Sequence, residues 1–326
     1  MMDYFYRIYG LRVQSQIPFP EAQPEKPGEA DVRIVFGRVP EFLREAAKKG
    51  YGTWTDGFLA AWFRVRDGSG VYVEAGKRIV VELAKEPQMT RLTSLLLSAG
   101  MALICLQRGE LFFHGSALEI RGQAVLLCGE SGAGKSTVAM ELLQGGAGFL
   151  ADDTVRVRPG PAGMLAEPSY PQQKLCRDMA LKCGVPLSEL RYIDEERDKY
   201  ARIRRDCYVK EAVKLGKIFL LRKTGADDGQ TKMQTERQTV CIGDRKNVDI
   251  TQADQVYIRS ITGQEALETL AAQLYLADTY RHITGIPYPL MEQLLQVAGQ
   301  AEICEILRPG TGDTVDGIVT KILQIC

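Results

Sequence analysis

The chain has 326 residues, and its 41 lysines and arginines balance its 41 aspartates and glutamates. This length allows one large domain and a smaller one. A net charge near zero excludes proteins that coat nucleic acid through bulk electrostatics, so no nucleic-acid partner is expected. The eight cysteines are scattered and lack the close spacing that zinc sites and disulfide frameworks require. Reduced, mostly buried thiols in a cytoplasmic protein are therefore expected.

Residues 1–88 predict a small β-rich N-terminal domain. Polar and apolar side chains alternate along residues 62–83, with Gly-containing turn sequences between the expected strands. Residues 17–30 are rich in Pro and Glu and predict a loop, while residues 40–50 have helical spacing and end at a glycine. Nothing in this part carries obvious chemistry, so we expect it to pack or to recognise a partner.

Residues 89–326 form the expected second domain, which begins with an apolar stretch. Residues 92–106 are the most apolar window, but these fifteen residues fall short of the roughly 20 that span a bilayer. A buried helix over about 89–108 is therefore expected. The N-terminus has neither a basic lead nor an apolar core, so it does not resemble a secretory signal. These features favour a cytoplasmic protein without membrane contact.

A hairpin leads into a glycine-rich loop. Residues 111–120 and 124–128 flank the turn sequence Arg121-Gly122 and predict its two strands. The loop that follows fits the phosphate-loop (P-loop) pattern G-x-x-x-x-G-K-[ST], and its residues, with the one after it, are Gly129, Glu130, Ser131, Gly132, Ala133, Gly134, Lys135, Ser136 and Thr137. These nine residues predict nucleotide binding.

The chemistry of the loop explains its composition. Glycines let the backbone curl so that successive N–H groups point at a phosphate, and the helix that begins near Lys135 adds its positive dipole end. Lys135 supplies a charge for the β- and γ-phosphates, and the Ser136 hydroxyl suits a Mg²⁺ ligand. ATP and Mg²⁺ are therefore the expected cofactors.

Two adjacent carboxylates, Asp152 and Asp153, follow the expected helix. Asp152 lies 16 residues beyond Ser136, which leaves room for one helix and one short strand, a minimal βαβ crossover. Loop and aspartates should then lie at the carboxyl ends of nearby strands, where open α/β sheets bind ligands. One acid can orient Mg²⁺ and the other can accept a proton from an attacking hydroxyl. A turn with solvated carboxylates is the alternative.

Further elements are expected beyond the aspartates. Residues 214–221 predict a strand, and residues 261–280 and 286–300 predict helices. His114, on the hairpin strand that leads back to the loop, is either a core histidine or part of the site.

A basic segment, residues 197–210, offers additional cations. Phosphoryl transfer needs charge neutralisation beyond one lysine and Mg²⁺, and the candidates in this segment are Lys199, Arg202 and Arg205. A solvated face is the alternative. Four more residues have weaker claims as phosphate or substrate contacts or as helix caps: Lys174, Arg177, Arg281 and His282.

Residues 114–155 resemble the catalytic core of bacterial HPr kinase/phosphorylase. That family carries a histidine, a P-loop and Ala-Asp-Asp in this order and at matching separations, as this chain does at His114, 129–136 and 151–153. The resemblance implies an α/β fold, the P-loop mixed sheet with helices that is shared with phosphoenolpyruvate carboxykinases. Here the β-rich N-terminal domain would precede it.

The resemblance also implies roles for individual residues. Lys135 and the loop amides would hold ATP, and Ser136 would ligate Mg²⁺ with support from Asp153. Asp152 would take the proton from a serine hydroxyl on the acceptor, and His114 would lie beside the reacting groups. Thr137 stands where the family usually has glutamate, and a second family signature, E-I-R-G, is not found after the aspartates. The reverse, phosphorylase reaction is therefore not implied.

The leading hypothesis is a Mg-ATP-dependent kinase that acts on a serine hydroxyl of a peptide or small protein. Shortened relatives that modify ribosomally made peptides, including lasso peptide precursors, resemble this chain as much as carbohydrate-regulation enzymes do. A nucleotide-gated binding module that hydrolyses ATP without transfer is one alternative. An HPr-type regulatory kinase and a small-molecule kinase are the others. A homo-oligomer is compatible with all of these.

Overall fold

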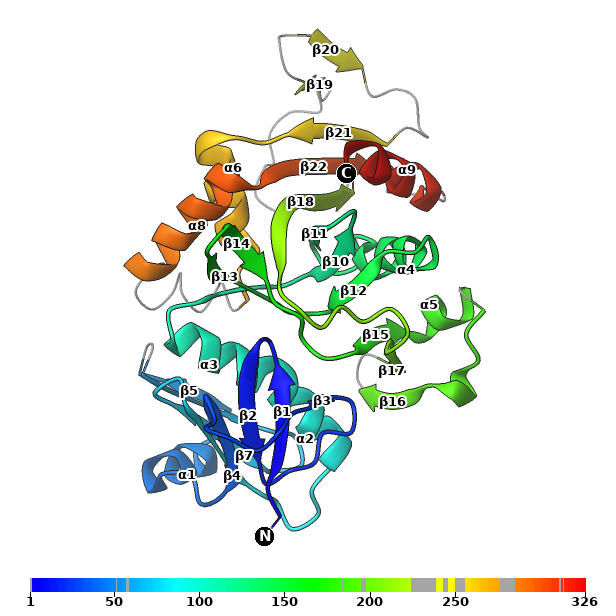
Figure 1. Cartoon of the computed structure of the whole chain (residues 1–326). Helices are drawn as coiled ribbons and strands as arrows, with labels where there is room; N and C mark the ends of the chain where they lie inside the picture. Colours follow the sequence, from blue (N-terminus) through cyan, green and yellow to red (C-terminus); the bar gives the residue numbers. More distant parts are fainter. Residues whose placement is uncertain are drawn as a thin grey trace.

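The structure is a computed structural model of the chain. It describes residues 2–50, 52–56, 59–182, 184–194, 198–223, 239–242, 246–249, 256–275, 285–310, 312 and 314–326. Two large sheets lie toward opposite ends of the molecule, and a small sheet lies beside the second one (Figure 1). The predicted α/β class, with a β-rich N-terminal part and a mixed sheet with helices, is confirmed.

The N-terminal part forms an eight-stranded sheet in the order β3-β1-β2-β4-β8-β7-β6-β5. Its strands are β1 (Tyr4–Ile8), β2 (Leu11–Ser15), β3 (Gln23–Pro24), β4 (Val32–Phe36), β5 (Thr53–Thr55), β6 (Ala60–Arg64), β7 (Gly70–Glu74) and β8 (Arg78–Glu82). The predicted helix is α1 (Glu41–Lys48). Period-two alternation buries one side chain in two along strands such as β2, which is what a sheet with one covered face requires.

A long helix packs on this sheet. It consists of α2 (Met89–Leu95), a π-helical turn (Leu96–Gly100) and α3 (Met101–Gln107). Its last residue, Gln107, donates through Nε2 to Val73 O (3.1 Å) and accepts from the Gly76 amide (2.8 Å). The helix has 19 residues, which is more than the fifteen of the predicted apolar stretch and long enough to cross a membrane. However, 61% of the apolar 18-residue window within it is buried inside the protein. That burial is typical of a core helix, and the domain boundary at residue 88 stays a prediction.

The second sheet has nine strands and carries the phosphate loop. Seven strands follow the order β12-β10-β11-β18-β14-β13-β9, and β22 pairs with β18 and with β21. The strands are β9 (Leu111–Phe113), β10 (Ser116–Ile120), β11 (Gln123–Gly129), β12 (Gly148–Ala151), β13 (Val155–Gly160), β14 (Gly163–Ala166), β18 (Val213–Lys223), β21 (Tyr257–Ser260) and β22 (Glu302–Arg308). The predicted 111–128 hairpin and the strand at 214–221 are both present.

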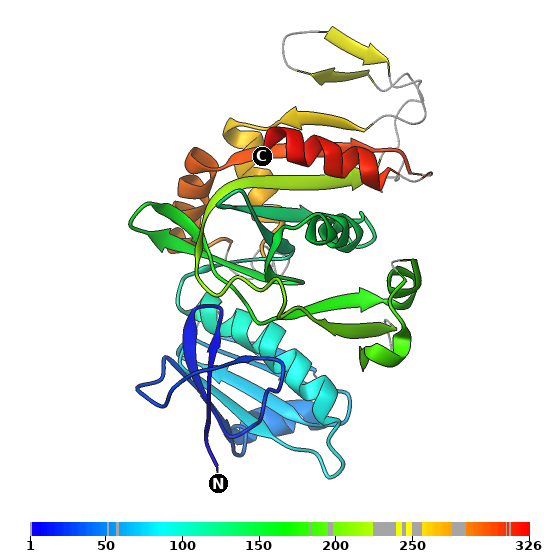
Figure 2. The same cartoon turned by 45° about the vertical axis from the view of Figure 1, so that its right-hand side comes forward.

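Helices cover both faces of this sheet (Figure 2). The apolar side chains of α4 (Lys135–Gln144) and α9 (Val315–Ile325) share one hydrophobic cluster with β10, β11, β18 and β22. Those of α6 (Gly263–Ala272) and α8 (Tyr288–Gln300) lie on the other face, in a cluster that continues through the 89–107 helix to the N-terminal sheet. One continuous core therefore joins the two sheets.

Strand direction decides which residues share an edge of the second sheet. β11 is parallel to β18, and β18 is parallel to β22. β10 is antiparallel to both β11 and β12, so β11 and β12 run in the same direction with β10 between them. The predicted crossover through α4 is thus present, but it passes over an intervening strand. The carboxyl ends of β11, β12, β18 and β22 and the amino end of β10 therefore lie at one edge.

A small three-stranded sheet, β15-β17-β16, lies beside that edge. It consists of β15 (Gln172–Cys176), β16 (Arg191–Asp194) and β17 (Lys199–Ile203), with α5 (Arg177–Lys182) and a 3₁₀ turn (Leu187–Glu189) between β15 and β16. Residues 199–203 of the predicted basic segment therefore form a strand. A separate hairpin is formed by β19 (Thr239–Ile242) and β20 (Lys246–Asp249). Helix α6 ends at Ala272, earlier than predicted, and Arg281 and His282 lie outside the described residues.

Candidate active site

The phosphate loop connects β11 to α4 with three glycines in left-handed or otherwise positive-φ conformations. Their φ angles are 133° at Gly129, 79° at Gly132 and 106° at Gly134, which side chains rarely tolerate. A Cβ on Gly129 would lie 2.4 Å from the carbonyl oxygen of Leu221 in β18. Glycine is therefore required at this position both by its own backbone and by the neighbouring strand.

Lys135, the first residue of α4, folds back over the loop. Its Nζ donates to the carbonyl oxygens of Gly129 (2.6 Å) and Glu130 (3.0 Å). Burial lowers the pKa of Lys135, although the carboxylates of Asp152 and Asp153 oppose the shift. A partly desolvated ammonium at a glycine-rich loop matches what a bound polyphosphate needs.

Arg308, the last residue of β22, contacts the outer side of the loop. Its Nε donates to Ala133 O (2.9 Å), and its Nη2 lies 3.5 Å from Gly132 O. Both contacts use carbonyl oxygens of the loop, so Arg308 itself occupies none of the loop amides. The linear sequence gave no sign of this residue, because it lies 173 positions beyond Lys135 and only the parallel pairing of β11, β18 and β22 brings it to the loop.

Gln273 joins the loop to His114 and was also not predicted. Its side-chain Oε1 accepts from the Gly129 amide (3.0 Å), and its backbone oxygen accepts from the His114 amide (2.9 Å). His114 lies between β9 and β10, just before the hairpin strand rather than on it. Burial lowers the pKa of His114, and Asp153 opposes the shift while Lys135 adds to it. The imidazole is therefore held toward its neutral form.

Asp152 follows β12 and is 5% exposed. Its Oδ1 accepts from the Ser116 hydroxyl (2.6 Å), and its Oδ2 accepts from the Lys174 backbone amide (2.8 Å). Burial raises the pKa of Asp152 above its usual value, although both hydrogen bonds oppose the shift. The predicted carboxylate at a strand end is thus present, and the alternative of solvated aspartates is wrong.

Asp153 has the opposite electrostatic environment. Lys174 Nζ lies 2.8 Å from its Oδ2, and Lys199 Nζ lies 4.0 Å from its Oδ1. Burial alone would raise the pKa of Asp153, but these two ammonium groups outweigh it and hold the pKa well below its usual range. Asp153 also has a φ of 70°, in the left-handed region. Lys174 and Lys199, predicted as phosphate or substrate contacts, therefore form ion pairs with the Asp153 carboxylate.

The other basic candidates lie elsewhere. Arg202 Nη1 is 3.5 Å from the sulfur of Met140 in α4, Arg205 donates to Pro20 O (2.9 Å), and Arg177 pairs with Asp198 (2.6 Å). The predicted residues that form one electrostatic cluster in the structure are His114, Lys135, Asp152, Asp153, Lys174 and Lys199.

The residues present fit a magnesium ion held mainly by a nucleotide. No group of three or more His, Cys, Asp or Glu side chains that could hold a metal exists within the described part of the chain. Mg²⁺ is commonly bound through phosphate oxygens, water and one or two protein ligands. Ser136, in the first turn of α4, fits one such ligand, whereas Asp153 would have to share its carboxylate with Lys174.

Comparisons with known proteins agree with this site over a limited segment. Residues 109–174 match the family model of the HPr Serine kinase C-terminal domain. HPr kinase/phosphorylases of Chlorobium chlorochromatii and Chlorobaculum tepidum are 50% identical over 46 residues, 14% of this chain and 14% of their own length. That of Bordetella pertussis is 39% identical over 80 residues, 24% of this chain and 25% of its own.

The predicted resemblance to the HPr kinase family is therefore confirmed for one segment. The matches cover at most a quarter of the length of these relatives, so this chain is aligned with only a small part of each protein. A solved HPr(Ser) kinase/phosphatase from Coxiella burnetii aligns over 66% of this chain and 88% of its own, with 11% identity and a TM-score of 0.29. A likeness this weak supports no statement about site residues or activity.

Proposed function

We propose that this protein is a Mg-ATP-dependent kinase that transfers the γ-phosphoryl group to a serine hydroxyl of a peptide or small protein. The loop amides and Lys135 would bind the triphosphate, and Ser136 would contribute to the Mg²⁺ shell. Asp152 would accept the proton of the attacking hydroxyl. Asp153 and Lys199, with His114, would complete the electrostatic surroundings of the transferred group.

The observation that supports this proposal best is the contrast between the two aspartates. Burial pushes the pKa of Asp152 up, while Lys174 and Lys199 push the pKa of Asp153 down. Adjacent titratable groups with pKa values driven apart are the usual sign of divided acid–base roles. Asp152, with the higher pKa, suits proton acceptance, and the fact that its carboxylate opposes the lowering of the Lys135 pKa supports a role close to the phosphate loop.

The acceptor and the cellular setting are inferred more indirectly. The matching family model is that of a serine kinase domain, which motivates a serine acceptor. The precursor of a ribosomally made peptide, such as a lasso peptide, is the acceptor we favour, because the N-terminal 88 residues fall outside the matched segment and are free to select a different substrate. A cytoplasmic location agrees with this chemistry, since ATP is available there.

Mass spectrometry would test the proposal directly. Candidate peptides encoded beside the gene are incubated with the protein, ATP and Mg²⁺, and serine phosphorylation is expected. Omission of Mg²⁺ should abolish it. ATP consumption without a modified peptide or protein acceptor would instead favour a nucleotide hydrolase, and a phosphorylated small molecule would overturn the peptide assignment alone.

A further inference from the structure

The tip of the first hairpin lies inside the molecule. β1 pairs with β2 as far as Ile8↔Leu11, so Tyr9 and Gly10 form a two-residue turn, and both have positive φ (51° and 72°). Such turns favour Asn-Gly and are ordinarily solvated. Tyr9 is instead 0% exposed, and a Cβ on Gly10 would lie 2.2 Å from Glu167 Oε2. The tip is therefore docked against the second sheet.

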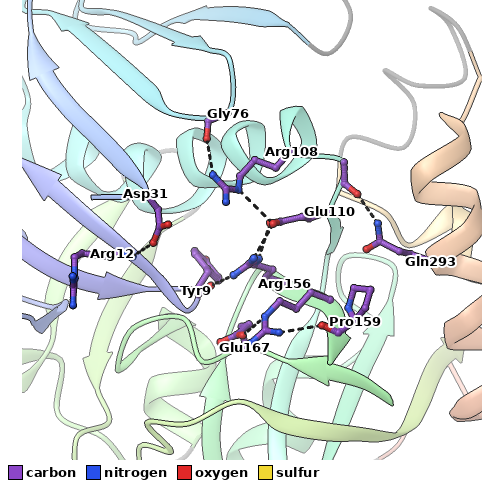
Figure 3. A network of polar contacts seen from close by, with 12 residues as sticks. Tyr9, Arg12, Asp31, Gly76, Arg108, Glu110, Arg156, Pro159, Glu167 and Gln293 are labelled. Carbon is purple, nitrogen blue, oxygen red and sulfur yellow. Dashed lines mark hydrogen bonds and ion pairs between the residues drawn. The ribbon is translucent and has the colours of Figure 1, made fainter. Parts of the chain in front are cut away.

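A buried arginine fixes the backbone of this tip (Figure 3). Arg156 of β13 donates through Nη1 to the carbonyl oxygen of Tyr9 (2.6 Å) and through Nε and Nη2 to Glu110 (2.8 Å each). Arg156 is 4% exposed. Glu110 also pairs with Arg108 (3.4 Å), which reaches the Gly76 carbonyl of the N-terminal sheet. The hairpin tip and the second sheet are thus joined through one buried polar network.

The Tyr9 side chain reaches the aspartate turn. Its hydroxyl lies 2.6 Å from Oγ1 of Thr154, which is 0% exposed and directly follows Asp153. Asp153 has a φ of 70°, in the left-handed region, which aspartate adopts more readily than most residues but still at an energetic cost. A hydrogen bond to the next side chain helps to hold the turn in this conformation. Asp152, one residue earlier, depends on the same turn for its direction.

The Tyr9 ring also touches the other segments that supply the site. It packs edge-on against Phe112 (centroids 4.9 Å apart), two residues before His114. On another side it packs against Tyr170 (6.3 Å), which precedes the strand that carries Lys174. One side chain from the N-terminal sheet therefore contacts all three segments that carry His114, the aspartates and Lys174.

We propose that Tyr9 is a positioning residue for the proposed phosphoryl transfer, acting through Thr154 on the Asp152–Asp153 turn. The inference rests on the proposed function, because it gives the turn a role in proton transfer. The hydroxyl, carbonyl oxygen and ring of Tyr9 contact Thr154, Arg156, Phe112 and Tyr170, all outside the phosphate loop, so its effect is expected on the transfer step and not on ATP binding. The N-terminal sheet would then be part of the catalytic machinery as well as a candidate for substrate selection.

A double-mutant cycle tests this inference. Tyr9→Phe and Thr154→Val each remove one partner of the hydroxyl pair and keep the shape of the side chain. Each should lower kcat about tenfold when kcat is expressed per chain that binds ATP. The reason is that a small displacement of a catalytic group lowers the rate by up to about a hundredfold. The double variant should also lose about tenfold, since both changes break one contact. ATP affinity should stay within about twofold, and Tyr4→Phe, on the strand β1 that leads into the turn, serves as the control.

Several outcomes would overturn the inference. Unchanged kcat in Tyr9→Phe is one, and multiplicative losses of about a hundredfold in the double variant are another. A loss of activity matched by an equal loss of ATP-binding stoichiometry would show a role in folding only. Hydrogen exchange adds a readout that needs no transfer activity: Tyr9→Phe should speed exchange in residues 150–156 and leave residues 129–145 unchanged. If the unmodified protein transfers no phosphate, the proposed function fails, and this exchange pattern still decides whether Tyr9 holds the turn.

Discussion

The phosphate loop and the aspartate turn lie at the same edge of one sheet, but different contacts hold them. The loop depends mainly on its own residues: three glycines set its path, and Lys135 donates to two carbonyl oxygens within it. The turn depends on distant segments, because Ser116 and the Lys174 amide hold Asp152.

This difference separates two kinds of function. A loop built from local sequence can bind phosphate in many proteins with different reactions. A carboxylate that several distant segments hold in place has one fixed position, and that position determines which reaction follows phosphate binding. Substitutions at the turn should therefore alter transfer, and those around the loop should alter nucleotide affinity. Four predictions test this division.

Asp152→Asn should have the largest effect. An amide cannot accept the proton of the attacking hydroxyl, so kcat for transfer should fall by about 10²-fold or more, with ATP affinity within about twofold. Kinetics with isothermal titration would measure both. Asp198→Asn, which changes an exposed aspartate paired with Arg177, is the matched control. Transfer within threefold of the unmodified protein would remove Asp152 from the proposed role.

Lys174→Met should mainly reduce stability. Among the described residues it leaves the partly buried Asp153 with Lys199 (4.0 Å) as its remaining ion-pair partner, so the free energy of unfolding should fall by about 2 kcal/mol, below the 3–5 kcal/mol typical of a fully unpaired buried charge. Denaturant titration would measure it, with Arg177→Met, in the exposed Arg177–Asp198 pair next to the same small sheet, as the control. An effect no larger than that of Arg177→Met would contradict the assigned environment of Asp153.

The pH dependence of this loss has a defined sign. The folded-state pKa of Asp153 is depressed and that of Lys174 is raised. The aspartate contribution is therefore present above the ordinary aspartate pKa of about 4 and is lost as pH falls below it. The lysine contribution is present below the ordinary lysine pKa of about 10 and is lost as pH rises above it. The stability difference between the two proteins should be flat between these limits and shrink outside them.

Ser116→Ala should have a moderate effect on transfer. The Ser116 hydroxyl opposes the burial that raises the pKa of Asp152, so its removal should raise that pKa further. The acid limb of the pH–rate profile should move to higher pH, and kcat near that limb should fall about tenfold. Ser98→Ala, at a buried serine in the 89–107 helix, should leave the profile in place. A limb that moves to lower pH would contradict the assignment.

Arg308→Met should have the smallest effect, and on ATP affinity alone. Loss of the guanidinium contacts to Ala133 and Gly132 loosens the loop, and hydrogen bonds of this kind contribute about 1 kcal/mol each. The dissociation constant for ATP should rise about fivefold, with kcat at saturating ATP unchanged. Arg222→Met, at an exposed arginine near the end of the neighbouring strand, should leave affinity unchanged. A fall in kcat without weaker binding would refute the division between loop and turn.

Local sequence sufficed for the loop, because its glycines and its lysine bind phosphate through residues adjacent in the chain. It also sufficed for the hairpin before the loop and for the strand that ends just before Asp152. It did not suffice for Lys174, which seemed a phosphate contact and proves to neutralise Asp153. Pairing between β15 and β17 aligns the segments that carry Lys174 and Lys199, and no local pattern encodes that pairing.

Local patterns along the chain were enough to predict a phosphate loop and two adjacent carboxylates, separated by one helix and one short strand. Long-range packing supplied the residues that complete the site: Arg308 and Gln273 at the loop, Ser116 and Lys174 at the aspartates, and Tyr9 at the turn that carries them. The reason is physical. Backbone conformation and helix dipoles are set by neighbouring residues, whereas the burial and charge that shift a pKa come from whatever the fold brings near.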